Sequence, residues 1–197
     1  MGRTLISRDP RIARTKRMLM ESLVELARHT SINCITVSQL TNKAKINRAT
    51  FYRHFTGMPD FLNQLLDDVF ENLQHPPTTT VFRNREAALT YYRQFFDSVK
   101  KHEDIFFSML GRNGLPDFRQ RFMEKRRPWH RNIVTAFRNE FKPDVEPELL
   151  VVSFIAVLLS LVEYWLHHNC AHTSEYMAEQ LVRLTHDRVL ATYGNGE

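Results

Sequence analysis

The chain has 197 residues, of which 43% are hydrophobic and 25% are charged. This balance excludes a mainly disordered chain, and the length is sufficient to bury a hydrophobic core in one or two domains. The two cysteines, Cys34 and Cys170, are too few for a disulfide framework, and we interpret them as reduced thiols. The first residues contain no apolar stretch of signal-peptide length, so we expect a cytoplasmic protein.

The net charge of +5 is unevenly distributed along the chain. Residues 1–60 contain 11 Lys and Arg against 4 Asp and Glu, whereas residues 61–197 contain 16 against 18. A basic module on a nearly neutral body favours a polyanionic partner, either nucleic acid or an acidic membrane surface. A solvated positive face would have the same composition, so charge alone leaves the partner open.

The spacing of apolar residues predicts an all-α protein of about nine helices, with no alternating strand pattern. Thr36 and Asn47 can cap the second and third helices, and Pro59 suits the first turn of the fourth. Pro128 lies inside the long seventh stretch and predicts a kink or a restart there. The helices are expected over residues 10–29, 36–44, 48–55, 60–73, 84–101, 103–111, 115–141, 146–169 and 173–193.

A proline- and threonine-rich segment separates the basic module from the rest of the chain. We interpret residues 74–81 as a linker, because His75-Pro76-Pro77 cannot continue a helix and three threonines follow. The sequence therefore predicts a first domain over residues 1–73 and a second domain over residues 82–197.

The second and third helices of the basic module are short and are joined by a tight turn, which is typical of a helix-turn-helix DNA-binding unit. Phe51 and Phe55 lie one turn apart and can anchor the third helix, so its other side chains are free to face a major groove. Arg48 can donate two hydrogen bonds to guanine, and Asn47 can either read adenine or cap the helix. The candidate DNA contacts are Thr36, Ser38, Lys45, Asn47, Arg48, Ala49, Thr50, Tyr52, Arg53 and His54.

The stretch ITVSQLTNKAKINRATFYRHFTGMPDFL resembles the DNA-binding domain of the TetR (tetracycline-repressor) family of bacterial regulators. The shared features are Thr36-Val37, the turn over residues 44–47 and the run from Thr50 to Phe55, and the resemblance covers about residues 10–70. It implies an all-α homodimeric transcription regulator, more often a repressor, that binds a palindromic operator on double-stranded DNA. It also implies that a small-molecule effector in the second domain changes the separation of the two recognition helices.

Two positions depart from the family pattern. Lys45 stands where the family usually has glycine, so it must accept a left-handed backbone or a different turn, and it can add a phosphate contact. Met58 stands where the family usually places a lysine that meets the DNA backbone. We therefore expect affinity to depend more on Arg48, on Arg53 and on an arm over residues 8–17.

The second domain is rich in aromatic residues that would form core and, as the resemblance implies, line an effector pocket. The candidate pocket residues are Tyr91, Phe95, Phe106, Phe107, Phe118, Phe122, Trp129 and Phe154. The apolar stretch 149–166 and the amphipathic stretch 176–190 suit a four-helix bundle between two copies. The candidate interface residues are Phe154, Leu158, Leu161, Trp165, Leu181 and Leu184.

Other interpretations have less support. Residues 149–166 are long enough for a membrane span, so a membrane-associated or protein-interaction adaptor is the alternative function, but Glu163 within the stretch argues against it. The cluster His167–His172 contains metal-ligand residue types, yet a polar helix end explains it, and no metal or cofactor is expected. The basic run Lys125–Arg127 is expected to be a solvated helix face. No catalytic motif is present, so we expect no enzyme.

Overall fold

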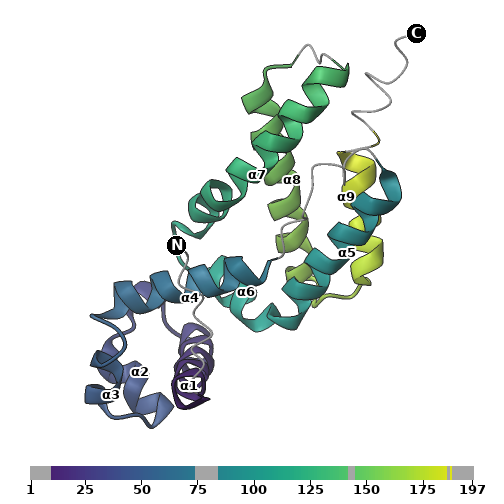
Figure 1. Ribbon diagram of the computed structural model, residues 1–197. Helices are drawn as coiled ribbons and strands as arrows, with labels where there is room; N and C mark the ends of the chain where they lie inside the picture. The colour runs from purple at the N-terminus through teal and green to yellow at the C-terminus, as the bar shows by residue number, and fades with distance from the viewer. Residues whose placement is uncertain (1–9, 74–83, 142–144, 186, 188–197) are drawn as a thin grey trace. The chain divides into compact units, whose positions relative to one another are not determined.

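The computed structural model describes residues 10–73, 84–141, 145–185 and 187, and within them every regular element is helical (Figure 1). The all-α prediction is therefore confirmed, and the described residues also contain a single 3₁₀ turn, Ile32–Cys34, which the apolar periodicity did not predict. The linker expected over residues 74–81 lies outside the described residues. The α-helices are α1 Pro10–Ala27, α2 Val37–Ala44, α3 Arg48–Tyr52, α4 Met58–Asn72, α5 Arg85–Lys101, α6 Glu103–Leu110, α7 Phe118–Phe141, α8 Pro147–His167 and α9 Ser174–Leu184.

The chain divides into two compact units, and each unit consists of two separate stretches of the sequence. The first unit contains the described residues up to Asn72 and also the segment Asp104–Phe118. The second unit contains the described residues of 73–103 and those from Arg119 onward. The chain therefore passes from one unit to the other at three places, and α6 belongs largely with α1 to α4.

Side-chain caps explain where the short helices of the first unit begin. Thr36 accepts a hydrogen bond from the backbone N–H of Gln39 at 3.2 Å, and the Thr36 N–H donates to Gln39 Oε1 at 2.9 Å. This reciprocal capping box starts α2, and Asn47 starts α3 by accepting from the Ala49 N–H at 2.8 Å. Of the two roles that the sequence left open for Asn47, the structure shows the cap.

Helix α3 packs on a cluster of three phenylalanines. The ring centres of Phe51 and Phe55 are 5.2 Å apart, and those of Phe55 and Phe61 are 5.1 Å apart. All three side chains are buried, and tilted or edge-on aromatic pairs at these distances are favourable beyond the apolar area they remove from water. As predicted, Phe51 and Phe55 anchor α3 from its inner side.

The segment after α6 is held against the end of α1. The Asn113 side-chain amide donates to the Ala27 carbonyl at 3.2 Å, and the Asn113 carbonyl accepts from the Ile32 N–H at 2.9 Å. Gly114 permits this turn, because a Cβ atom there would lie 2.1 Å from the Met109 carbonyl oxygen. These contacts explain why the segment packs with the first unit.

Helices α5, α7, α8 and α9 build the second unit, in which α5 packs mainly against α9. Ion pairs join α7 to α8: Arg119 pairs with Glu163, and both Arg127 and Arg131 pair with Glu148 at 3.2 and 3.0 Å. Helix α7 continues through Pro128 without the restart that the sequence allowed.

Helix α8 is long and apolar enough to cross a membrane by length and composition. Within the second unit, however, it is a core helix: one side is buried, and Glu163 is ion-paired to Arg119. The buried residues on that side are Val151, Ile155, Leu158, Leu159, Val162, Trp165 and Leu166. This packing accounts for the apolar residues on that side of α8.

Candidate nucleic-acid interface

The residues predicted to contact DNA lie on the outward side of the helix-turn-helix. Six of the ten have exposed side chains around α3, whereas Phe51, between them in sequence, is fully buried. Thr36 is also exposed, and Ser38, Thr50 and His54 are half-buried. The six exposed residues are Lys45, Asn47, Arg48, Ala49, Tyr52 and Arg53.

Arg48 and Tyr52 lie one turn apart on the exposed side of α3. The Tyr52 side chain is 49% exposed, and the Arg48 guanidinium lies 6.0 Å from the centre of its ring. Tyr52 also contacts the buried Phe51 ring edge-on, with 5.5 Å between the ring centres. The buried Phe51 therefore fixes the position of the Tyr52 ring, while the Tyr52 hydroxyl and the Arg48 guanidinium remain available to a partner.

Exposed cations continue along the first turns of α1. Arg11, Arg14 and Arg17 are exposed, whereas Lys16 is half-buried and lies 3.8 Å from Asp68 of α4. Burial raises the pKa of the Asp68 carboxyl, and the charge of Lys16 opposes that rise. Lys16 therefore serves contacts within the first unit, and Arg17 lies 3.9 Å from Glu21 on the same helix. Arg8, the first cation of the predicted arm, lies outside the described residues.

In the second unit, Arg126 is surrounded by aromatic rings. This side chain is 2% exposed, so the solvated basic face expected around it is wrong at this position. It donates to the Tyr91 hydroxyl at 2.7 Å, and its guanidinium lies 4.9 Å from the Phe95 ring centre and 5.6 Å from that of Trp129. Burial raises the pKa of Tyr91, so its hydroxyl stays protonated beside the guanidinium.

The eight aromatic residues predicted to line one pocket of the second domain are divided between the two units. Phe106, Phe107 and Phe118 belong to the first unit, where Phe118 packs against Phe106 and Phe70 with ring centres 6.2 and 5.6 Å apart. Phe107 is 50% exposed, in contrast to the buried Phe106 beside it. The other predicted residues belong to the second unit, where Phe122 is buried and Phe154 half-buried; the remaining three are Tyr91, Phe95 and Trp129.

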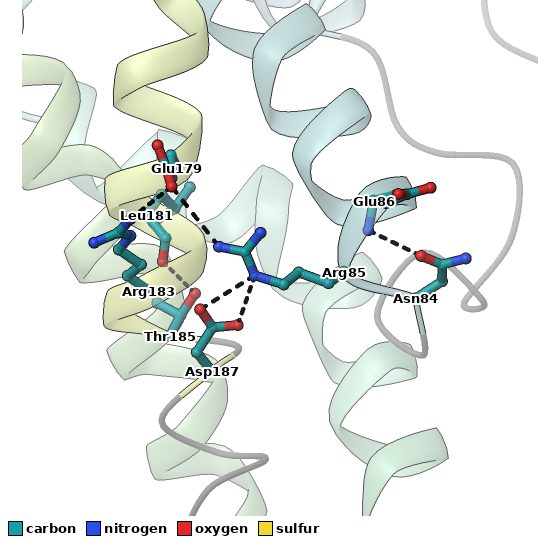
Figure 2. Close-up of polar contacts among 8 residues, drawn as sticks. All are labelled: Asn84, Arg85, Glu86, Glu179, Leu181, Arg183, Thr185 and Asp187. Carbon is teal, nitrogen blue, oxygen red and sulfur yellow. Dashed lines mark hydrogen bonds and ion pairs between the residues drawn. The ribbon is translucent and has the colours of Figure 1, made fainter.

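A groove of about 440 Å³ lies instead between α5 and α9. Its charged lining residues come from both helices, and a network of ion pairs joins those helices at the start of α5. Figure 2 shows Arg85 between Asp187, at 3.4 Å, and Glu179, at 4.0 Å; Arg183 also reaches Glu179, at 2.7 Å. The groove residues are Glu86, Leu89, Thr90, Arg93, Glu175, Ala178 and Glu179, and none of them was among the predicted ligand contacts.

Several residues predicted for the dimer interface are buried within one protomer. Leu158, Trp165 and Leu181 have almost no exposed surface, so they are unavailable to a second chain, and this part of the prediction is wrong. Phe154 and Leu161 are half-buried, and Leu184 is exposed. The side of α8 that does face outward is a stripe with small residues at its centre, and the spacing of those residues was the sequence signal that we missed. The stripe consists of Leu149, Ser153, Ala156, Ser160 and Tyr164.

The histidine-rich segment forms the turn from α8 to α9. The ring centres of His168 and Tyr164 are 4.1 Å apart, and His172 stacks on Tyr176 with 4.4 Å between their ring centres. Trp165 Nε1 donates to the His172 carbonyl at 3.0 Å, which ties the turn back to α8. Among the described residues, no group of three or more His, Cys, Asp or Glu side chains could hold a metal ion.

Comparisons with known proteins relate both the sequence and the fold to one class of regulator. Residues 86–187 match a TetR-type family model described as a transcriptional regulator C-terminal region. A TetR transcriptional regulator from Streptococcus agalactiae 2603V is 20% identical, with a TM-score of 0.65 over 91% of this chain and 97% of that one. Among curated proteins, no sequence matches.

Two further solved structures share the fold at low identity. One is NalD, the secondary repressor of the MexAB-OprM multidrug efflux pump in Pseudomonas aeruginosa: it is 17% identical, with a TM-score of 0.59 over 88% of this chain and 94% of that one. The other is the dihydroxyacetone kinase operon activator DhaS, 16% identical, with a TM-score of 0.58 over 91% of this chain and 96% of that one. One of these names describes a repressor and the other an activator.

Proposed function

This chain belongs to the TetR family of transcriptional regulators, and on that premise we propose that its first unit binds double-stranded DNA as half of a homodimer. The observation that carries the proposal is the outward side of α3. It carries the exposed side chains of Arg48 and Tyr52, with the exposed Arg53 directly after the helix, while Phe51 holds the helix from its inner side. Such a helix can enter a major groove without disturbing its own core.

Within this interface we assign base reading to Arg48. It is the first residue of α3, and the N-terminal residues of a recognition helix are those that reach base edges. A guanidinium can pair with O6 and N7 of guanine at once, which an ammonium cannot do. Tyr52 and His54 then contact phosphates through their hydroxyl and ring N–H groups.

The second copy would cover the outward stripe of α8. Leu149 is 56% exposed and Tyr164 49% exposed, and the three small residues between them allow another helix to approach closely. On α9, Tyr176 and Leu184 are also exposed. Burying these apolar side chains would favour association. A two-fold dimer built here would read a palindromic operator with two α3 helices in successive major grooves.

We further propose that the protein acts as a repressor in the cytoplasm, without catalysing a reaction, and that a small-molecule effector controls it. Repression is favoured over activation because TetR-family regulators are more often repressors. The coupling route is the segment Asp104–Phe118, which follows α5, precedes most of α7, and is hydrogen-bonded to the end of α1 through Asn113. An effector that changed the relative positions of α5 and α7 would thereby act on α1, provided that it bound one state better than the other.

The decisive experiment is Arg48→Ala with a duplex that the purified chain itself selects from a random-sequence library. We expect binding to weaken by about 1–3 kcal/mol, roughly 5- to 150-fold, with a looser preference at one base pair of each half-site. Arg48→Lys, the matched control, keeps the charge and should still lose that preference. Unchanged affinity and footprint for Arg48→Ala would remove this residue from base reading, and selection of no duplex by the parent chain would refute DNA binding.

A further inference from the structure

Lys45 has a backbone conformation that lysine adopts only at a cost. It follows α2 with φ 53° and ψ 40°, in the left-handed region, and no other described non-glycine residue of the first unit has a positive φ. A side chain with a Cβ is strained in this region, whereas glycine adopts it freely. The position would therefore favour glycine if only the turn mattered.

The turn itself makes no use of the lysine side chain. The Lys45 N–H donates to the Asn42 carbonyl at 3.2 Å, and the Ile46 N–H donates to the Thr41 carbonyl at 2.9 Å, so backbone groups alone close the end of α2. The Lys45 side chain is exposed, and within the part of the chain that the structure describes it has no carboxylate partner. Its neighbour Lys43, in contrast, pairs with Glu25 of α1.

The charge of Lys45 lies in a basic neighbourhood. It precedes Arg48 by three residues, and Arg53 lies at the other end of α3. Like charges gathered on one surface repel one another until a polyanion neutralises them. Lys45 therefore adds backbone strain and like-charge repulsion to the isolated fold.

We propose that Lys45 is a positioning residue for DNA, whose ammonium pairs with a backbone phosphate beside the base pairs that α3 reads. The inference rests on the proposed DNA-binding function and adds to it a residue whose retention trades stability of the fold for affinity. A phosphate contact fixes the register of α3 on the duplex but carries no sequence information.

The proposal makes a quantitative prediction about salt. Each phosphate contact contributes about 0.9 to the slope of log affinity against log salt concentration. Loss of one contact should therefore lower affinity about eightfold in 0.1 M salt and hardly at all as the salt approaches 1 M. The loss should be the same on the selected duplex and on a shuffled duplex of equal length, because the contact is independent of sequence.

The test compares four variants of the full chain on these two duplexes, with thermal unfolding measured in parallel. Lys45→Gly and Lys45→Asn both remove the charge and accept the left-handed backbone, so both should lower the salt slope by about 0.9. Lys45→Gly should also raise the Tm by about 2–4 °C, an opposite change that loss of structure would not produce. Lys45→Arg should keep the slope of the parent chain.

The matched control is Lys43→Gln, which removes an equal charge two residues away but one already paired with Glu25. It should leave the salt slope unchanged. Parent-like slopes for Lys45→Gly and Lys45→Asn would overturn the inference while leaving DNA binding by the parent intact. An equal fall for Lys43→Gln would overturn it as well, because the effect would then follow from net charge. If the parent chain binds neither duplex, it is the proposed function that fails.

Discussion

Helices α3 and α8 present two kinds of surface to their surroundings. Helix α3 has five residues, buries Phe51 and leaves Arg48 and Tyr52 exposed. Helix α8 has 21 residues, buries seven of them and leaves a stripe of small and apolar side chains exposed. The polar side of α3 is well solvated before any partner arrives, whereas the stripe on α8 gains free energy only when it is covered. A DNA-binding surface can therefore be complete in one protomer, while the α8 surface calls for a second.

The largest expected effect is on the stability of the first unit, which holds α3 in place. Phe51→Ala leaves a cavity in the small core under α3, and we expect a loss of about 3–5 kcal/mol from the free energy of unfolding of the first unit. Tyr52→Ala, the matched control, should leave that stability nearly unchanged and weaken DNA binding instead. Trp129 and Trp165, which are the two tryptophans of the chain, lie in the second unit. Their fluorescence should keep its folded value in Phe51→Ala while the amide resonances of α3 lose their dispersion.

A second pair of variants separates the outer and inner sides of α8. Ala156→Asp places a charge on the exposed stripe, and burying it in a dimer would cost several kcal/mol, so we expect dimer dissociation to increase at least 100-fold. Sedimentation should then report monomers with unchanged helical content. Leu158→Asp places the same charge in the core and should unfold the second unit. A stable dimer of Ala156→Asp would place the interface elsewhere.

The smallest expected effect distinguishes the units by their response to acid. Burial lowers the pKa of His102, at the end of α5, so the unfolded chain takes up this proton at a higher pH than the folded one. The free energy of unfolding of the second unit should therefore decrease as the pH falls below about 6.5. His102→Asn should weaken this dependence in urea titrations that follow tryptophan fluorescence. Asp68 in the first unit has the opposite sign, because its raised pKa favours the folded state as the pH falls.

Local chemistry made the helix-turn-helix predictable from sequence. Thr36 and Asn47 are residues whose side chains satisfy the first backbone N–H groups of a helix, so their positions indicate where α2 and α3 begin. The left-handed backbone at Lys45 was one of two alternatives implied by the TetR resemblance, in which this position is usually glycine, and the structure shows it. The spacing of Phe51 and Phe55 defines the buried side of α3 and, by exclusion, the exposed side chains.

Tertiary packing limited the other predictions. Most residues of α8 are apolar, so apolar periodicity did not indicate that Leu158 and Trp165 face their own protomer. The spacing of the small residues Ser153, Ala156 and Ser160 was the sequence signal for the outward side. Arg126 lies in a basic run that resembles a solvated face, and only the rings of Phe95 and Trp129 explain its burial. Long-range contacts of this kind have no periodic signature along the chain.

The hydrogen bonds of Asn113 have a practical consequence for anyone who wants the DNA-binding part by itself. A fragment that stops at the end of α4 would omit Asp104–Phe118, exposing the Ile32 N–H and the Ala27 carbonyl that Asn113 satisfies and removing the Phe118 ring from Phe70. Cutting the chain once, after α4, would thus yield an incomplete first unit. A transplantable version requires the later segment to be grafted back, for example through a short glycine-rich loop from α4 to α6.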